Sequence, residues 1–393
     1  MKEVFIVSVA RTPIGSFGGS IASIAATDLG SVAVKGALSK TSLEPGQIQE
    51  IFMGQVVQAN AGQAPARQVA LLAGLPDATP ATTVNKVCAS GMKSIMFGAQ
   101  SIQLGQNEIV VAGGMENMSS IPYYLSKGRY GYQYGHGELT DGLIRDGLAN
   151  VYDNQAMGCF ADATAIKHNI SREEQDAYAI QSYQRSAASW EKDSFADEVV
   201  AVEVKDRRGN VTIVNTDEEY KNVKFEKIPS LRPVFTKDGT VTAANASTIN
   251  DGAAAMILAD QDTINKYQLK PLARIVAYAD AAQAPEWFTT APVLATEKVL
   301  SRANLKMSDI DYIEVNEAFS VVALAFIKHF NLDQSKVNIL GGAVSLGHPL
   351  GCSGARIVTT LTQVLVQQKG KYGLAAICNG GGGASAMVIE CCR

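Results

Sequence analysis

The chain has 393 residues, 47% of them hydrophobic and 18% charged, with a formal net charge of −4. One hydrophobic core stops growing at about 250–300 residues, so this length predicts two or three structural units, and the composition excludes a disordered chain. No stripe of lysine and arginine is present, which argues against a nucleic-acid partner. We therefore expect an anionic ligand to be bound by a local patch or by backbone N–H groups.

No apolar run approaches the roughly 18 residues of a membrane-spanning helix, and the first residues, MKEVFIVSVARTPIG, lack the pattern of a signal peptide. The six cysteines show neither CxxC pairs nor regular spacing, which disfavours zinc and a disulfide framework. The sequence thus predicts reduced thiols, a cytoplasmic location and no membrane partner.

The first part of the chain alternates short apolar runs with helical patterns, which is typical of a layered α/β protein. In chain order we predict a strand at 4–9, a helix at 26–39, a strand at 50–54, a helix at 64–72, a helix that begins at Cys88 and a strand at 108–112.

Residues from about 119 to 249 differ from this pattern: tyrosine and glycine cluster at 123–137, and a charged segment follows a helical stretch at 172–192. We interpret them as an insertion, after which the first unit resumes in a strand at 250–259 and a linker at 266–271. The predicted units are therefore 1–265, which contains the inserted loop domain at about 119–249, and 270–393.

The second unit repeats the first. QIQEIFMGQV (47–56) matches DIDYIEVNEA (309–318) at its apolar positions, which places Gly54 opposite Asn316. At near-equal spacing follow Gly91 in VCASGMKSI and Gly354 in GCSGARI, and then an apolar strand that ends in glycines. Three matches in the same order predict two copies of one α/β unit related by a pseudo-twofold axis.

Cys88 lies in NKVCASGMKS, where the apolar spacing places it at the start of a helix. The positive end of the helix dipole would lower the pKa of the thiol and favour a nucleophilic thiolate. On this motif alone, an inert buried cysteine is the alternative.

His348 lies in a glycine- and proline-rich turn before a helix, GGAVSLGHPLGCSGAR, and is the one histidine of four whose setting suits a base for a cysteine. Cys378 ends an apolar strand and precedes four glycines, whose N–H groups can converge on an oxyanion, although a tight crossing is the alternative. Asn316 ends another strand, where its carboxamide can position a water or a histidine, or serve only as a turn residue.

Together with ARTPIGSFGG, GGMENMS and NASTINDGAAA, these motifs resemble the thiolase family along the whole chain, most closely its biosynthetic-type acetyl-CoA acetyltransferases. The resemblance implies the α/β thiolase fold, with two duplicated βαβαβαββ halves in a five-layered α-β-α-β-α arrangement and an inserted loop domain. It implies an acyltransferase that condenses two acetyl-CoA reversibly to acetoacetyl-CoA and CoA through an acetyl-Cys88 intermediate.

By the same resemblance Cys88 is acylated, His348 activates it, and Cys378 is the acid and base at the substrate α-carbon. Asn316 holds an oxyanion-hole water, and the N–H groups of Cys88 and Gly380 form an oxyanion hole.

The resemblance also implies that the insertion binds coenzyme A and that a hairpin at about 123–136 builds a homotetramer, a dimer of dimers. The implied coenzyme A contacts are Ser247, Tyr183, Lys224 and Lys227. The alternative interpretation of the two lysines is that they belong to a solvated charged face that binds no ligand. A mobile lid is the alternative for the hairpin.

No cofactor is expected beyond the coenzyme A thioesters, with potassium as an activator. VTAANAS is similar to the potassium-responsive relatives, which implies K⁺ contacts at Tyr183, Val344 and the carbonyl oxygens of Ala243, Ala244 and Ala246.

Several positions depart from the family pattern: Ala156 for His, Asp162 for Glu, Asn117 for Ser, and Thr289 for the Pro that potassium-responsive relatives carry. None removes a reactive group, but Ala156 alters the expected acyl pocket. A degradative 3-ketoacyl-CoA thiolase therefore stays an alternative. Cys378 in place of a second histidine disfavours a decarboxylating ketoacyl synthase, and the intact reactive positions disfavour a non-catalytic lipid-binding protein.

Overall fold

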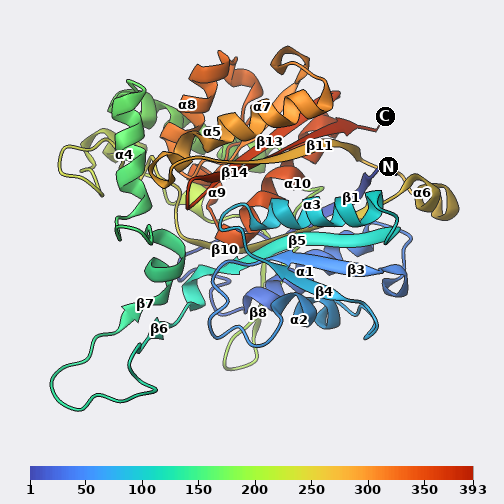
Figure 1. The fold of residues 1–393 in the computed structure, drawn as a ribbon, viewed down its shortest axis with the longest axis horizontal. Coiled ribbons are helices and arrows are strands. Elements are labelled where there is room, and N and C mark those ends of the chain that lie inside the picture. Colours follow the sequence, from blue (N-terminus) through green and yellow to red (C-terminus); the bar gives the residue numbers. More distant parts are fainter. Residues whose placement is uncertain (393) are drawn as a thin grey trace.

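The computed structural model describes residues 1–392 and shows two related halves that carry one inserted segment (Figure 1). Ten strands are connected in the order β12-β13-β14-β11-β1-β10-β5-β3-β4, with β2 beside β10. Only two residue pairs, Phe5 with Arg274 and Ile6 with Ala273, join the halves at β1 and β11. The sheet is therefore two sheets that meet at a narrow seam.

The elements of the two halves follow in the same order, except that the second half has an isolated bridge, Ile313 with Val337, where the first has the strand β4. The first half comprises β1 (Phe5–Arg11), β2 (Gly15–Ser16), α1 (Ala26–Ser39), β3 (Glu50–Gly54), α2 (Pro65–Leu72), β4 (Ala81–Val84), α3 (Ser90–Gln103), β5 (Ile109–Asn117), β10 (Asn250–Ala259) and α6 (Gln261–Tyr267). The second comprises β11 (Ala273–Ala282), α7 (Ala291–Ala303), β12 (Tyr312–Val315), α8 (Ser320–Phe330), α9 (Ala343–Leu346), α10 (Leu350–Gln368), β13 (Tyr372–Asn379) and β14 (Gly383–Cys391).

Five layers follow from where the apolar faces are buried. Helices α1 and α2 cover the outer face of the first sheet, α7 and α8 cover that of the second, and α3 and α10 lie between the sheets (Figure 1). One apolar core fills the outer gap of each sheet, and a third surrounds α3 and α10 and contacts both sheets, since a helix stripe and a sheet face must be buried against a partner. The expected thiolase fold and its α-β-α-β-α layering are confirmed.

The pseudo-twofold axis predicted from the repeat passes between α3 and α10. A Cβ on Gly91 would lie 2.6 Å from the backbone nitrogen of Ala355, and one on Gly354 would meet the backbone nitrogen of Met92. The two matched glycines thus allow the central helices to cross at backbone contact, which is the physical reason for the repeated motif.

The predicted elements agree with the structure except at some boundaries. Helix α3 begins at Ser90 rather than at Cys88, because Ser90 bonds the turn that precedes it. Strand β5 runs to Asn117 rather than ending at 112, since β10 pairs with its whole length. The predicted linker at 266–271 starts inside α6, which ends when Gln268 adopts a left-handed conformation.

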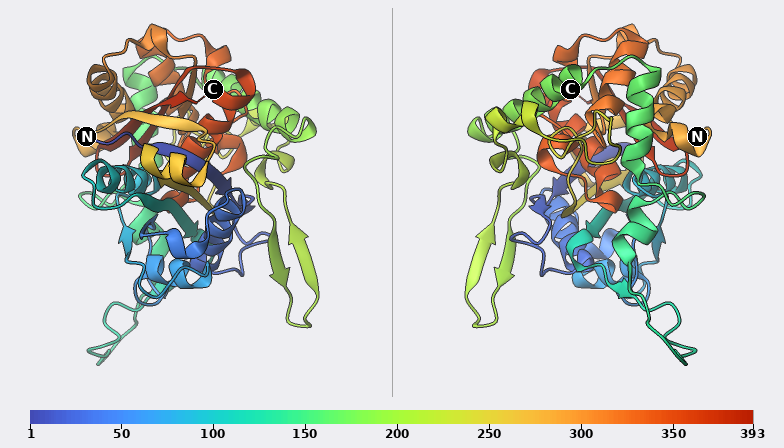
Figure 2. Two further views of the ribbon diagram at one scale, coloured as in Figure 1. Left: turned by 90° about the vertical axis from the view of Figure 1, so that its right-hand side faces the viewer. Right: turned by 90° about the vertical axis from the view of Figure 1, so that its left-hand side faces the viewer.

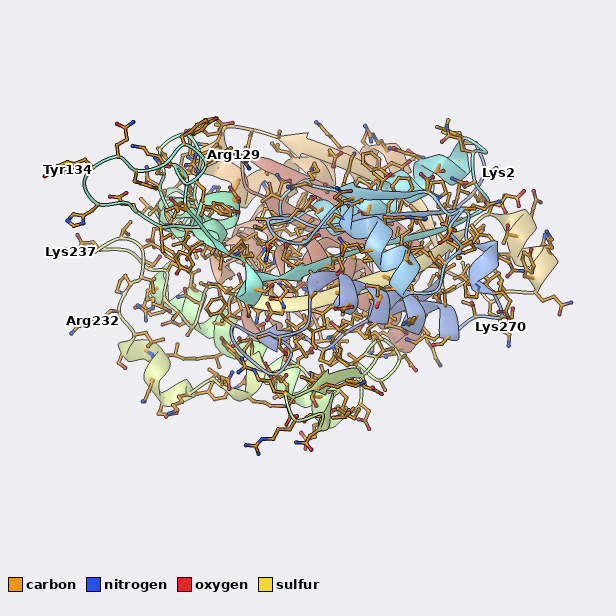
Figure 3. The ribbon with its side chains drawn as sticks, turned by 90° about the horizontal axis from the view of Figure 1, so that it is seen from below. Lys2, Arg129, Tyr134, Arg232, Lys237 and Lys270 are labelled. Atoms are coloured by element: carbon orange, nitrogen blue, oxygen red, sulfur yellow. The ribbon has the colours of Figure 1, made fainter. Side chains whose placement is uncertain are left out.

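The insertion packs against one end of the two halves. It contains β6 (Tyr123–Tyr124), β7 (Thr140–Asp141), α4 (Met157–Lys167), α5 (Arg172–Glu191), β8 (Val202–Lys205) and β9 (Val211–Val214). The β6–β7 arm projects in Figure 1, and the β8–β9 hairpin projects in Figure 2. Figure 3 shows Arg129 and Tyr134 at the end of the arm, with the whole side chain of Tyr134 exposed. Among residues 1–392, no helix is long and apolar enough to cross a membrane.

Candidate active site

Cys88 is presented by a strained turn between β4 and α3. Val87 has a φ of 48°, a left-handed conformation that is rare for a β-branched residue. Three hydrogen bonds hold it there: the Val87 N–H donates to Asn85 Oδ1 (2.9 Å), the Ser90 hydroxyl donates to the Val87 carbonyl (2.6 Å), and the Lys86 N–H donates to Ser90 Oγ (2.8 Å). The turn therefore places the thiol just before the first turn of α3.

The expected lowering of the Cys88 pKa is wrong for the resting protein. Burial, with a small contribution from Glu116, raises the pKa of this thiol to about 11. The N–H groups of Gly380 and of Cys88 itself donate to the sulfur and oppose that rise only in part. Desolvation outweighs the helix terminus, so the thiol is protonated at neutral pH and needs a base.

His348 lies in the turn between α9 and α10 and has the properties of such a base. Its Nδ1 is 2.6 Å from Ser353 Oγ, and the Ser353 hydroxyl donates to the Pro349 carbonyl at 2.9 Å. Because the serine proton is used there, this network favours the tautomer in which His348 Nδ1–H donates to Ser353 and Nε2 keeps its lone pair. Burial, with a contribution from Arg356, lowers the His348 pKa to about 3, so the ring is neutral.

Asn316 directly follows β12 and lies beside the histidine. Its N–H donates to the Ala376 carbonyl (2.9 Å), and its Nδ2 is 3.5 Å from His348 Nδ1. Within the described residues, Asn316 Oδ1 and His348 Nε2 are buried without a hydrogen-bond partner. An unpaired buried polar atom costs about 1–3 kcal/mol, so this pair is typical of a site that a ligand or water completes.

Cys378 lies near the end of β13, where two glycines turn the chain into β14. Gly381 and Gly382 have φ values of 83° and 85°, and a Cβ on Gly382 would meet the Gln283 carbonyl oxygen. Burial raises the pKa of the Cys378 thiol well above its ordinary value, and the neighbouring Cys88 raises it further. A Cβ built on Gly380 would lie 3.5 Å from Val87 Cγ1, so the glycine turn lies against the turn that carries Cys88.

The structure thus places Cys378 beside Cys88 and Asn316 beside His348, and Leu350, two residues after His348, belongs to the cluster against which Cys88 packs. The other histidines lie elsewhere: His136 is on the exposed arm, His168 follows α4, and His329 contacts Glu297 at 3.2 Å.

Sequence reasoning did not single out two residues that shape this site. Ser353 orients His348, and its signal was its place in the repeat, where it matches Ser90. Glu116 accepts N–H bonds from Val56 (2.9 Å), Val57 (3.2 Å) and Gly351 (2.8 Å), which fastens the start of α10 to the loop after β3. Burial raises the pKa of Glu116 to about 7.

The predicted coenzyme A residues lie in the insertion and next to it. The Ser247 N–H donates to the Ala318 carbonyl at 3.0 Å. Tyr183 is buried, with its ring edge-on to Phe225 at a centroid distance of 6.4 Å. Lys224 and Lys227 are exposed on the segment that holds Phe225.

Of the predicted K⁺ residues, Tyr183 and Val344 share one small buried cluster. Ala243, Ala244 and Ala246 lie in a turn that closes when the Ala246 N–H donates to the Thr242 carbonyl at 3.1 Å. Their part in ion binding stays a prediction.

Comparisons with known proteins match the chain along its length. The family model for the thiolase N-terminal domain matches residues 4–262, and that for the thiolase C-terminal domain matches residues 269–391. The acetyl-CoA acetyltransferase of Schizosaccharomyces pombe is 55% identical over 389 residues, covering 99% of this chain and 98% of the relative. The mitochondrial acetyl-CoA acetyltransferase of Homo sapiens is 55% identical over 391 residues, covering 99% and 91%. The crystal structure of Acat5 thiolase from Ascaris suum in complex with coenzyme A is 46% identical, covers 100% of both chains and has a TM-score of 0.95.

Proposed function

Because the chain belongs to the thiolase family, we propose that it is an acetyl-CoA C-acetyltransferase, which condenses two acetyl-CoA reversibly to acetoacetyl-CoA and CoA. The observation that carries this proposal is the pair of neighbouring thiols, the partly exposed Cys88 and the buried Cys378, together with the unpaired Nε2 of a neutral histidine. The names of relatives at 55% identity, and the coenzyme A bound by a similar solved structure, support the same substrate class.

In the first half-reaction the Cys88 sulfur attacks the acetyl-CoA carbonyl carbon, and the carbon–sulfur bond to coenzyme A breaks. His348 Nε2 takes the thiol proton and returns it to the departing coenzyme A sulfur. Since the Cys88 pKa is about 11 and the His348 pKa about 3 in the resting site, proton transfer accompanies the attack rather than preceding it. The product is acetyl-Cys88.

In the second half-reaction Cys378, a thiol at rest, gives its proton to the neutral His348 and then takes the α-proton of another acetyl-CoA. The enolate carbon bonds to the acetyl carbonyl carbon, the bond from that carbon to the Cys88 sulfur breaks, and this sulfur takes the proton from His348. We assign the N–H groups of Cys88 and Gly380 to the oxygen of the acetyl-Cys88 carbonyl, and this is supported by the fact that both groups lower the pKa of the Cys88 thiol. The enolate oxygen would lie against His348 and a water held by Asn316.

The test of the substrate is the thiolytic kcat/KM on acetoacetyl-CoA against that on a long-chain 3-ketoacyl-CoA. We expect the short substrate to be preferred. A clear preference for the long chain would contradict the proposal and favour the degradative thiolase, whose reactive residues are the same.

We also propose a homotetramer, on the ground that the β6–β7 arm exposes Tyr130 (89%) and Tyr134 to solvent. Light scattering of the protein and of a variant that lacks residues 125–137 tests this assembly. A tetramer that survives the deletion would contradict the part given to the arm.

Coenzyme A contacts at Ser247, Tyr183, Lys224 and Lys227 remain part of the proposal, supported by the exposure of the two lysines. Lys224→Glu and Lys227→Glu should each raise the KM for acetoacetyl-CoA while leaving kcat unchanged. Activation by K⁺ is tested by rates in KCl and NaCl at equal ionic strength, and equal rates would exclude it. A cytoplasmic location is tested by cell fractionation.

A further inference from the structure

Lys86 stands two residues before the nucleophile, in the first half, yet its side chain ends among oxygen atoms of the second half. Its Nζ lies 2.9 Å from Ser385 Oγ, 3.1 Å from the Ala384 carbonyl, 3.3 Å from Asn379 Oδ1 and 3.1 Å from Asp280 Oδ1. The side chain is 24% exposed. An ammonium has three N–H donors, so the second half satisfies all of them.

One of these contacts leads back to the reactive thiol. Lys86 Nζ donates to Asn379 Oδ1, and Asn379 Nδ2 donates to the Gly380 carbonyl at 2.8 Å. Gly380 in turn lies against the turn that precedes the thiol, since a Cβ built on it would come 3.5 Å from Val87 Cγ1. Its backbone N–H also lowers the pKa of the Cys88 thiol. The contacts therefore form a closed ring that leaves the chain at Lys86 and returns to it at the turn that carries Cys88.

Asp280, on β11, binds two members of this network, Lys86 and Ser385. Its Oδ1 accepts the Ser385 hydroxyl at 2.6 Å and also faces Lys86, and its Oδ2 accepts Lys93 Nζ at 2.7 Å. Lys93, on α3, has a similar exposure of 19% and lies over the Phe97 ring. Among the described residues, Lys93 makes no hydrogen bond to Asn379, Ala384 or Ser385, so Lys93 is a matched control.

We propose that Lys86 is a positioning residue that holds the Gly380 amide against the Cys88 sulfur through the side chain of Asn379. The proposal rests on the acyl-transfer function given above, in which Gly380 N–H binds the acetyl-Cys88 oxygen. Small displacements of such a donor matter, because an error of about 1 Å in a reacting geometry costs up to about 100-fold in rate.

The first readout is turnover. Lys86→Met removes the ammonium and keeps the length of the side chain, and Asn379→Ala breaks the ring while Lys86 keeps its charge. We expect each to lower kcat by about tenfold or more and to leave the KM for acetoacetyl-CoA within about twofold, since an oxyanion donor acts in the transition state. Lys93→Met should keep the wild-type kcat, and Lys86→Arg should recover part of it.

The second readout needs no turnover: the pH dependence of Cys88 alkylation by iodoacetamide, followed by mass spectrometry. Loss of the Gly380 donor should move the midpoint to higher pH in both Lys86→Met and Asn379→Ala, but not in Lys93→Met. A shift in Lys86→Met alone would show a direct charge effect and overturn the proposal. An unchanged kcat and midpoint with only a lower melting temperature would overturn it too.

The two readouts separate this inference from the proposed function. If the wild type fails to cleave or form acetoacetyl-CoA, the proposed function is wrong. The alkylation profiles of the three variants then still decide whether Lys86 positions the glycine turn.

Discussion

The two copies of the repeated unit differ most where their central strands end. In the first copy β5 continues past Gly113 and Gly114 to Asn117 and carries the buried Glu116 carboxylate. In the second copy the left-handed Gly381 and Gly382 turn the chain after Asn379. The matching strand thus ends with the Glu116 carboxylate, which binds the start of α10, in the first copy. In the second copy it ends with the Cys378 thiol, next to the glycine turn. A change of strand ending is enough to give the two copies different chemistry.

The central helices differ in a related way. Ser90 and Ser353 occupy matching positions beside Gly91 and Gly354, and each bonds the turn before its own helix. In the first copy that turn holds Val87 in a strained conformation and presents the Cys88 thiol. In the second copy the serine Oγ also lies 2.6 Å from His348 Nδ1. The same position of the repeat therefore supports the turn before a cysteine in one half and contacts a histidine in the other.

The largest expected effect separates the two thiols. Cys88→Ser should lower acyl transfer by at least about 1,000-fold, because a serine hydroxyl is a much poorer nucleophile here. Cys378→Ser should still be acetylated by acetyl-CoA, which mass spectrometry of the intact protein would show, but should not condense. Normal turnover in either variant would contradict the division of work between the halves.

The glycine turn gives the next largest effect, on stability. Gly382→Ala should lower the free energy of unfolding by about 3 kcal/mol for two reasons: the new Cβ would clash with the Gln283 carbonyl oxygen, and alanine disfavours the positive φ of this position. Gly381→Ala has the same φ problem with nothing within 4 Å of its Cβ, so a loss of about 1 kcal/mol is expected. Denaturant unfolding compares them, and equal losses would show that the close contact carries no weight.

A smaller effect on activity is expected from losing the hydrogen bond that orients His348. Ser353→Ala should lower kcat/KM by about tenfold, because one hydrogen bond of about 1.4 kcal/mol no longer fixes the His348 tautomer. Thr362→Ala is the matched control: its hydroxyl makes the same kind of bond within α10, to the Val358 carbonyl at 2.8 Å, and serves no histidine. The idea fails if both variants lose activity equally.

The smallest expected effect concerns Glu116 and pH. Its folded pKa of about 7 lies above the ordinary 4.5, so its stabilising contribution is full below pH 4.5 and is lost as the pH rises through 7. The slope is at most about 1.4 kcal/mol per pH unit. Glu116→Gln should therefore show a smaller fall in melting temperature between pH 5 and pH 8 than the wild type. An identical fall would show that Glu116 does not titrate in this range.

Local patterns determined much of the result from the sequence. The bounds of α1, β3 and β10 agree with the predicted ones because period and flanking residues fix them locally. The repeat located the pseudo-twofold axis, since only glycine permits the backbone contact of α3 with α10. The motifs around Cys88, His348 and Cys378 predicted the groups to which we assign the reaction.

Only the tertiary structure decided how those groups behave. The direction of the Cys88 pKa reversed because burial by the whole molecule outweighs the local helix terminus. The tautomer of His348 depends on which acceptor remains for its Nδ1–H. Lys86 reaches Ser385, 299 residues away along the chain. Desolvation and the contacts between the halves depend on residues that are distant in sequence, so no local pattern encodes them. The hydrophobic period, the turn residues and the types of reactive side chain, by contrast, can be read from the sequence.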